Sequence, residues 1–497
     1  MVRLSAAGAA LSLMSTTLAV PTRRADVLAC LQDAGVPADL RGTEEWSWDG
    51  TAYNLRVPVQ PAAIAVPQTI EHIVAAVKCG VQNGVPVNAK GGGHGYTSLG
   101  FGGEDGHLTI EMDRMHNVTL DKETNQARVQ PGTRLGHLAT ELLNQGNRAI
   151  SHGTCPGVGA AGHSLHGGYG MVAHGHGLAL DWLIGATVVL ANGTTVHCSE
   201  DENSDLFWAL RGAAPSFGIV AELEYKTFEV PEQMTVFTVP IPMDKSNASQ
   251  SLRDIQAYGK TMPRNMALQT YIDRTGYQLI GSFMGNETEM HAGLDPLVEK
   301  VAGWYEVAEA KNWTDYIIFH GNIGDDIDIT TPAYSAHDNF YASSMVVPEI
   351  SAEQFQSFAD YVADVGQTID ESHDWFIQMD AIGGDTSAVS DVANDATAYP
   401  HRDKLLLFQL YDATLNINQT YPDDGYSFLK GFRTSITDTM TNGTWGIYAN
   451  YADGQLTSEE AQTLYWADNL PRLRELKATY DPDNIFRSTQ SVQLTSA

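Results

Sequence analysis

The chain has 497 residues, enough for about two to four domains of ordinary size. Hydrophobic residues make up 43% of it, which excludes a wholly disordered protein. There are 29 basic and 60 acidic side chains, so the net charge of −31 argues against nucleic acids and anionic membranes as partners. Only 18% of the residues are charged, and an uncharged polar surface is common in secreted proteins that bind neutral polar ligands.

The N-terminus is typical of a secretory signal peptide. Arg3 precedes an apolar run that ends at Leu18, too short for a comfortable membrane span, and residues 17–19 form a suitable cleavage site. We therefore expect residues 1–19 to be removed and the mature protein to be extracellular. A second processing site at Arg23-Arg24 would extend the removed segment to residue 24.

Four cysteines are too few for a disulfide framework in a chain of this size. Cys30 and Cys79 both lie early, on helix-like segments, and we expect them to form one bridge. Cys155 and Cys198 are left unassigned, with Cys198 typical of a buried thiol at a strand end. Seven Asn-x-Ser/Thr triplets support a glycosylated secretory product: Asn117, Asn192, Asn247, Asn286, Asn312, Asn418 and Asn442.

Residues 60–110 predict an α+β unit. A short strand at 64–66 precedes a helix at 70–81 that Thr69 can cap, and a further strand starts at Val85.

Residues 181–198 predict a β-hairpin with its turn at Asn192-Gly193. Ser204 can cap a short helix that runs to Arg211, and the alternation over 222–228 predicts a strand.

The character of the sequence changes near Val230-Pro231, where the glycine-rich stretches thin out. Strand-like alternation then mixes with amphipathic helices, such as the one expected at 351–365, and the chain from Trp445 to its end reads as helical. We therefore expect an α+β protein in three segments: a first domain at 25–229, an inserted domain at 230–442 and a C-terminal return at 443–497.

The first glycine-rich segment, Lys90-Gly-Gly-Gly-His94-Gly95-Tyr96, follows a predicted strand. Three consecutive glycines let backbone N–H groups approach an anion closely, which suits a pyrophosphate. The segment lacks the Gly-Lys-Ser/Thr ending of a P-loop. A tight turn would also explain the glycines, but the adjacent His and Tyr favour a binding role.

The second glycine-rich segment runs from Ser151 to Leu178. Residues 157–162 spell G-x-G-x-x-G, yet Cys155-Pro156 precedes them in place of a hydrophobic strand, and Gly167-Gly168 argues against a long helix. We therefore reject a Rossmann fold and predict an extended wall along a flat ligand.

Histidines are frequent in this second segment, but their spacing matches no common zinc pattern, so we expect no metal site. His166, His174 and His176 are best explained as hydrogen-bonded polar groups.

Polar side chains recur on three later segments that we predict to be strands. Because side chains alternate along a strand, Gln378 shares a face with Asp380, Gln409 with Tyr411, and Tyr451 with Asp453. Amides, carboxylates and aromatic rings on one sheet suit a neutral sugar. Any one of these strands could instead carry a solvent-facing polar side.

Together these segments resemble the berberine-bridge-enzyme-like branch of the vanillyl-alcohol-oxidase flavoprotein superfamily. Within it they are most similar to fungal secreted glucooligosaccharide, chitooligosaccharide and xylooligosaccharide oxidases. The resemblance covers nearly the whole mature chain, and its most specific element is the pair His94 and Cys155. The motifs that carry it are Lys90–Tyr96, Gly100–Gly103, Gly153–Pro156 with His163, Asp181–Ala186, Leu206–Gly212, Asn450–Asp453 and Tyr480–Phe486.

The resemblance implies an FAD-binding domain of the PCMH type, with two α+β subdomains built from both chain ends. Between them it implies a substrate domain with an antiparallel sheet backed by helices. It also implies FAD attached by two bonds, from His94 to the 8α carbon and from Cys155 to C6 of the flavin ring. Further implied cofactor contacts are Gly91, Gly92, Gly93, Gly95, Ser98, Thr154, Gly159, Gly162, His163 and Ile219.

The implied reaction is oxidation of the reducing-end anomeric carbon of an oligosaccharide to a lactone, which hydrolyses to an aldonic acid, while oxygen becomes hydrogen peroxide. Tyr451 would remove the hydroxyl proton, and Asp380 would assist it, because a free phenol with a pKa of about 10 is a weak base at neutral pH. The implied sugar contacts are Tyr96, Gln378, Gln409, Tyr271 and Phe376. The protein is expected to act as a monomer.

Two positions depart from the glucooligosaccharide oxidases: Tyr271 replaces an acidic residue, and Phe376 replaces a Trp. A narrower site at Tyr271 would favour xylose-based oligomers, which lack the hydroxymethyl arm. Two alternatives stay open. One is a flavin oxidase of another alcohol or of an alkaloid-type metabolite, and the other is a secreted carbohydrate-binding protein, which would need neither His94 nor Cys155.

Overall fold

The computed structural model describes residues 22–321, 326–330 and 336–494. The predicted signal peptide at 1–19 lies outside the described residues, and Arg23-Arg24 falls within helix α1 (Thr22–Asp33). No helix in these three ranges is both long and apolar enough to cross a membrane.

The N-terminal part forms a small sheet in the order β1-β2-β4-β3, in which β2, β4 and β3 are parallel and β1 pairs antiparallel with β2. The predicted strand, helix and strand of residues 60–110 are confirmed, and the Thr69 hydroxyl accepts a hydrogen bond from the His72 backbone N–H at 3.3 Å to cap the helix. The elements are α2 (Glu44–Asp49), α3 (Ile70–Gln82), β1 (Ala38–Asp39), β2 (Ala63–Ala65), β3 (Val87–Lys90) and β4 (Leu108–Glu111).

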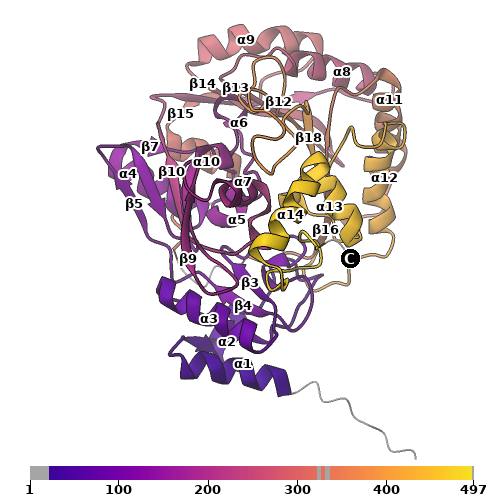
Figure 1. Cartoon of the computed structure of the whole chain (residues 1–497). Helices are drawn as coiled ribbons and strands as arrows, with labels where there is room; N and C mark the ends of the chain where they lie inside the picture. The colour runs from indigo at the N-terminus through magenta and orange to yellow at the C-terminus, as the bar shows by residue number, and fades with distance from the viewer. Residues whose placement is uncertain (1–21, 322–325, 331–335, 495–497) are drawn as a thin grey trace, which may run out of the picture.

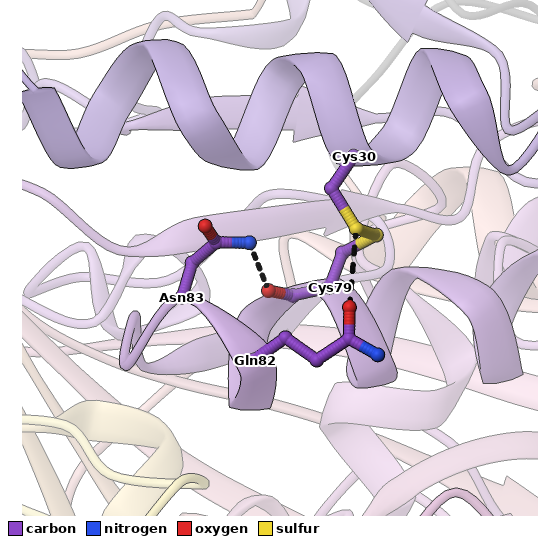
Figure 2. Close-up of a disulfide and its surroundings, with 4 residues drawn as sticks. All are labelled: Cys30, Cys79, Gln82 and Asn83. Atoms are coloured by element: carbon purple, nitrogen blue, oxygen red, sulfur yellow. Dashed lines mark hydrogen bonds between the residues drawn. A yellow bond between two sulfur atoms is a disulfide. The ribbon is translucent and has the colours of Figure 1, made fainter.

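The predicted disulfide is confirmed. Cys30 of α1 and Cys79 of α3 are bonded with their Cα atoms 5.7 Å apart, and Figure 2 shows the bridge joining the two helices. Beside it, the Asn83 side-chain N–H donates to the Cys79 carbonyl at 2.8 Å, at the end of α3. Cys198 is fully buried, as expected of an ordinary interior thiol.

A second, five-stranded antiparallel sheet has the order β5-β6-β10-β8-β9. The predicted hairpin is β8 and β9, with Gly193 of its turn at φ +76°. The prediction that Ser204 caps the next helix was wrong: Asn203, in the left-handed region, precedes the helix and makes no side-chain cap bond. The strands are β5 (Val118–Asp121), β6 (Gln126–Val129), β8 (Leu183–Val189), β9 (Thr195–Ser199) and β10 (Ile219–Lys226).

Helices cover this sheet, and the rejection of a Rossmann fold is confirmed. The G-x-G-x-x-G segment runs into a helix of only six residues, and the neighbouring sheet is antiparallel rather than parallel. The helices are α4 (Leu135–Gly146), α5 (Ala160–Leu165), α6 (Ala173–His176) and α7 (Ser204–Ala213), and a short ribbon pairs β7 (Arg148–Ala149) with β11 (Phe228–Glu229).

The third sheet has seven strands in the order β15-β12-β14-β13-β17-β18-β16, and every neighbouring pair is antiparallel. The strands are β12 (Met234–Ile241), β13 (Met266–Asp273), β14 (Gly276–Met284), β15 (Val307–Lys311), β16 (Phe340–Val347), β17 (His373–Ala381) and β18 (Leu406–Thr414).

One face of this sheet is covered by helices (Figure 1). Trp375, Ile377 and Met379 point toward them from β17 and join one hydrophobic core. The alternate residues of β17 therefore point to the opposite face. The helices are α8 (Ala248–Gly259), α9 (Glu287–Lys300), α11 (Ala352–Tyr361) and α12 (Gly425–Thr437), while α10 (Trp313–Gly321) packs in a separate core beside β12.

The helix expected at 351–365 is confirmed: α11 begins at Ala352 and continues without a break into a π-helical turn at Val362–Gly366. Its start is held by a capping box between Ser351 and Gln354.

The expectation of a helical C-terminal segment is correct only in part. Helices α13 (Ser458–Trp466) and α14 (Leu470–Tyr480) lie there, but residues 482–494 are irregular. This end returns to the first part of the chain, where the Val87 N–H donates to the Ile485 carbonyl at 2.9 Å beside β3.

The sheets and helices make this an α+β protein, as predicted. The antiparallel sheet backed by helices is also present.

Candidate active site

The two glycine-rich segments meet backbone to backbone. A Cβ atom built on Gly92 would lie 2.3 Å from the Gly159 nitrogen, and one on Gly159 would lie 2.2 Å from the Gly92 nitrogen. The Arg134 guanidinium donates to the carbonyls of Gly92 and Gly157, each at 2.6 Å. The glycines are therefore required because no side chain fits where the two segments touch.

His94 and Cys155 lie together at this junction, with His94 Nε2 and Cys155 Sγ 3.9 Å apart. Burial, together with the charge of Arg134, lowers the pKa of His94 to about 3, so its imidazole is neutral. The ring of Tyr53 stacks on that imidazole at a centroid distance of 3.8 Å. The geometry thus presents one neutral imidazole and one thiol side by side.

His163 ties the second glycine-rich segment to the C-terminal return. Its Nε2 accepts a hydrogen bond from the Gly153 N–H at 2.9 Å, and its carbonyl accepts one from the Asn450 side chain at 2.9 Å. Burial lowers the pKa of His163 to about 3, which keeps Nε2 available as an acceptor. A Cβ on Gly153 would lie 2.8 Å from the His163 ring, so the loop packs directly on this histidine.

The other predicted cofactor residues occupy different surroundings. Gly95 and Gly162 border open space, since a Cβ on either would meet no atom within 4 Å, whereas one on Gly91 would lie 2.9 Å from the Pro131 carbonyl oxygen. Ser98 has a φ of +56°, and its hydroxyl donates to the Val57 carbonyl at 2.7 Å.

Of the remaining predicted cofactor residues, Gly93 has a φ of +70°, and Thr154 lies in the loop next to Cys155. Ile219 opens β10 opposite Val189 and belongs to the core of the first part of the chain.

Asp380 is fully buried on the face of the seven-stranded sheet that the helices leave free. Its Oδ1 accepts a hydrogen bond from the Gln269 side chain at 2.8 Å. Burial raises the pKa of Asp380 to about 7, and hydrogen bonds from Gln269 and Tyr169 limit the rise. The carboxyl group therefore changes its charge near neutral pH.

Tyr451 comes to the same face from a 3₁₀ turn at Ala449–Tyr451. Its ring stacks on Tyr96 with centroids 5.8 Å apart. Burial is the main cause that raises the pKa of Tyr451, and the nearby Tyr96 and Asp380 raise it further. The phenol is therefore held in its neutral form.

Amide groups line the same face. Gln378 of β17 lies in register with Gln409 of β18 and with Tyr271 of β13. The Gln409 side-chain N–H donates to the Tyr96 hydroxyl oxygen at 2.7 Å, which links the sheet to the first glycine-rich segment.

Aromatic rings form a row beyond these amides. Tyr271 stacks on Phe376 with centroids 5.5 Å apart, and Phe376 stacks on Tyr411 at 4.8 Å. The face therefore combines hydrogen-bonding groups with flat apolar surfaces.

The prediction that Tyr451 and Asp453 share a face of a strand was wrong. The segment is a 3₁₀ turn followed by extended residues, and Asp453 turns away to bond Tyr341 and Arg433. Alternation applies only to extended chains, and four residues are too few to distinguish a strand from a tight turn.

Sequence reasoning missed two members of the site, Gln269 and Tyr169. Gln269 stands two residues before Tyr271 on the same strand, so strict alternation from Tyr271 would have found it. Tyr169 lies within the Gly167–Gly170 stretch, where only its contact with Asp380 identifies it.

Two of the histidines that we predicted to be hydrogen-bonded polar groups have partners nearby. His166 Nδ1 lies 2.7 Å from the Gly162 carbonyl, and His174 Nε2 lies 3.2 Å from the Thr386 hydroxyl. Among the residues that the structure describes, no cluster of three or more His, Cys, Asp or Glu side chains could hold a metal ion.

Two protein families match the chain, and the first of them is a flavoprotein family. The family described as "FAD binding domain" matches residues 61–199, and the one described as "Berberine and berberine like" matches residues 447–493. These regions hold both glycine-rich segments and Tyr451.

Relatives match over nearly the full length. A chitooligosaccharide oxidase of Gibberella zeae is 50% identical over 97% of each chain, and a glucooligosaccharide oxidase of Sarocladium strictum is 46% identical over 99% of each. An FAD-linked oxidoreductase, dpmaF, of Metarhizium anisopliae is 50% identical over 94% of this chain and 90% of its own.

Solved structures agree. A chitooligosaccharide oxidase structure superposes with a TM-score of 0.92, at 50% identity, over 95% of this chain and 100% of the other. A second structure is of glucooligosaccharide oxidase from Acremonium strictum and concerns its 6-S-cysteinyl, 8α-N1-histidyl FAD. It superposes with a TM-score of 0.92, at 45% identity and with the same coverage. The chain belongs to the FAD-dependent oligosaccharide oxidases of the berberine-bridge-enzyme-like family.

Proposed function

We propose that this protein is a secreted oxidase that converts the reducing-end anomeric carbon of oligosaccharides to a lactone. The carbon loses one hydrogen and its hydroxyl loses another, and oxygen takes up the two electrons and two protons as hydrogen peroxide. The observation that carries the proposal is one polar face on which Asp380, Tyr451 and two glutamines gather, joined through Tyr96 to the His94 loop.

We infer that FAD is bound by two covalent bonds, through His94 and Cys155. The fit is supported by the neutral imidazole and the thiol 3.9 Å apart, and by glycines whose backbone N–H groups can approach a pyrophosphate. The related glucooligosaccharide oxidase, whose FAD is named as cysteinyl and histidyl, supports the same assignment. When bound, FAD supplies the two-electron acceptor.

Tyr451 accepts the proton of the anomeric hydroxyl in this proposal, and Asp380 assists it. A phenol that burial keeps neutral can accept this proton only as it releases its own, so it needs a nearby base. Asp380 can take up the released proton once its carboxyl group is ionised, above a pH of about 7. Gln269 orients its carboxylate from the neighbouring strand.

The sugar rings bind along the same face. Tyr96, Gln378 and Gln409 offer hydrogen bonds to ring hydroxyls, while Tyr271 and Phe376 offer stacking surfaces for the next sugar. We propose that Tyr271 narrows the site and favours xylose-based chains, which have no hydroxymethyl arm.

A second candidate substrate is an alcohol or alkaloid-type secondary metabolite. It is favoured by the 50% identity to dpmaF, whose name gives no sugar. The amide-lined face argues for the sugar, because a mostly apolar ligand would offer the Gln378 amide no hydrogen bond.

Secretion and glycosylation complete the proposal. All seven Asn-x-Ser/Thr asparagines are exposed, and the N-terminal sequence is that of a signal peptide.

We further propose domains at 25–229 and 230–442, a C-terminal return at 443–497, and a monomeric state.

The test is peroxide production by the purified protein with xylobiose, cellobiose, chitobiose and a panel of non-sugar alcohols. Oligosaccharides should give peroxide, with the highest kcat/KM for xylobiose, and Tyr451→Phe should abolish it. Tyr305→Phe, outside the site, is the matched control, since that hydroxyl bonds only Asp295 between α9 and β15. A higher kcat/KM for cellobiose would remove the xylose preference. Activity on the alcohols alone would overturn the sugar proposal.

A further inference from the structure

The segment that carries Tyr451 crosses an edge of the seven-stranded sheet. β16 is the last strand at that edge, and Val346 and Gly446 exchange backbone hydrogen bonds of 2.8 and 3.0 Å beside it. The following residues run along β16, where Tyr451 reaches the polar face and Asp453 reaches the helix-covered face. Three residues thus straddle the sheet edge.

Asp453 is the anchor on the helix side, and it is fully buried. Its Oδ1 accepts a hydrogen bond from the Tyr341 hydroxyl at 2.7 Å, and its Oδ2 accepts one from Ser343 at 2.8 Å and one from Arg433 at 2.6 Å. The Gln490 side chain donates to the Asp453 carbonyl at 2.8 Å. The carboxylate is therefore held from β16 and from α12, and the backbone of the same residue is held from the C-terminal end.

Ser344 is the anchor on the other side of β16. Its hydroxyl lies 3.2 Å from the Tyr451 carbonyl, to which it donates, and it accepts from the Tyr448 N–H at 3.1 Å. Ser343 and Ser344 are consecutive, so their side chains point to opposite faces. The two serines therefore hold residues 451–453 from opposite faces of β16.

We propose that Asp453 and Ser344 are positioning residues that fix Tyr451 relative to Asp380 on the polar face. This inference rests on the proposed function, in which Tyr451 is the proton acceptor. A buried ion pair such as Asp453–Arg433 often contributes little net stability, because both charges lose their hydration. Its value here is geometric, since a displacement of about 1 Å in a reacting group can cost about 100-fold in rate.

The experiment compares variants of the two positioning residues, here called the clamp variants, with a matched control. Asp453→Asn removes the charge, and Ser344→Ala removes one hydroxyl without a change of charge. Asp412→Asn makes the same change at another fully buried carboxylate, bonded to His373 and Tyr421 on the helix-covered face. Each variant is measured for thermal midpoint, flavin per chain, kcat, KM and the pH profile of kcat/KM.

We expect both clamp variants to lose about tenfold or more in kcat per bound flavin, with KM changed less. The acidic limb of the pH profile should stay in place, since the partners of Asp380 are untouched. Asp412→Asn should lower the thermal midpoint and keep its kcat. Ser344→Ala keeps the test valid if Asp453→Asn does not fold.

Unchanged kcat per flavin in Ser344→Ala would overturn the inference, as would an equal loss of kcat in Asp412→Asn. Tyr451→Phe separates this result from failure of the proposed function. If Tyr451→Phe is inactive and the clamp variants are normal, only the positioning role falls. If Tyr451→Phe keeps full activity, or the wild type oxidises no sugar, the proposed function falls and the inference falls with it.

Discussion

At the scale of single residues, the site is organised around a buried carboxyl group whose charge depends on its neighbours. Burial removes the hydration that stabilises the ionised form of Asp380, and hydrogen bonds from Gln269 and Tyr169 replace only part of that stabilisation. Tyr451, which is partly buried, stays neutral because the loss of hydration raises its pKa. The pH dependence of the reaction should therefore reflect Asp380 more than Tyr451.

The first prediction concerns stability and activity at Asp380. Its pKa is 3.8 in an unfolded chain and about 7 in the folded one, so folding retains a proton there at intermediate pH. The contribution of Asp380 to the free energy of unfolding falls as the pH rises from 3.8 to about 7, and it stays low at higher pH.

Asp380→Asn cannot ionise, so it should be more stable than the wild type above pH 7 and lose that advantage below pH 3.8. In the wild type, kcat/KM should rise with pH, with its midpoint near pH 7. Urea unfolding at several pH values and a pH–rate profile check both parts. A stability difference that grows as the pH falls would contradict the assignment.

The second prediction concerns Gln269. Gln269→Met keeps the volume but removes the N–H that stabilises the ionised carboxylate. The pKa of Asp380 should rise, and the acidic limb of the pH–rate profile should move up by about one pH unit. Thr270→Val is the control, because Thr270 is the fully buried neighbour paired with Met379 on the helix-covered side. An unmoved limb in Gln269→Met would show that this hydrogen bond does not set the charge of Asp380.

At the scale of elements, His94 and Cys155 lie in two loops without regular structure. They hold their shape because glycine backbones touch and Arg134 bonds both of them. Neither loop could place His94 or Cys155 alone.

The third prediction follows from that contact. Gly92→Ala places a Cβ 2.3 Å from the Gly159 nitrogen, so the loops must separate, at a cost of about 1–3 kcal/mol. The fraction of chains that retain flavin after acid precipitation should fall. Gly293→Ala on α9, where the nearest atom would be 3.4 Å away, is the control. Normal flavin retention in Gly92→Ala would show that the contact is not needed.

The fourth prediction concerns the bridge between α1 and α3. The bridged cysteines are 49 residues apart, so removing the cross-link costs about 4 kcal/mol in the chain-entropy estimate. Replacing both Cys30 and Cys79 by Ala should make α1 the first segment cut in limited proteolysis, while peroxide production by intact protein persists. Resistance equal to that of the wild type would mean that packing alone holds α1.

How far the sequence predicts these elements depends on how local their signals are. The Thr69 cap and the Asn192-Gly193 turn depend on adjacent residues, and both were found. Tyr451 and Asp453 were misplaced because a 3₁₀ turn beside β16 depends on Ser343 and Ser344, more than 100 residues away. The contact of Gln269 with Asp380 joins two strands whose pairing no local pattern reveals.

At the scale of the whole molecule, the chain brings together groups from distant parts of the sequence. His94 and Cys155 come from the first part, Asp380 from the seven-stranded sheet and Tyr451 from the C-terminal return. Gln409 links the sheet to Tyr96, and Asn450 links the return to His163. The resemblance to known flavoproteins predicted this assembly, whereas residue patterns alone gave only its separate pieces.

The fifth and most direct measurement is anaerobic mixing of the purified yellow protein with an oligosaccharide, followed by flavin absorbance. The account predicts that xylobiose or cellobiose bleaches the flavin in the wild type and in Tyr305→Phe, and that admitting oxygen restores the colour with one peroxide per flavin. Tyr451→Phe should bind the same flavin and stay yellow. A protein without flavin, or a flavin that no oligosaccharide bleaches, would contradict the account.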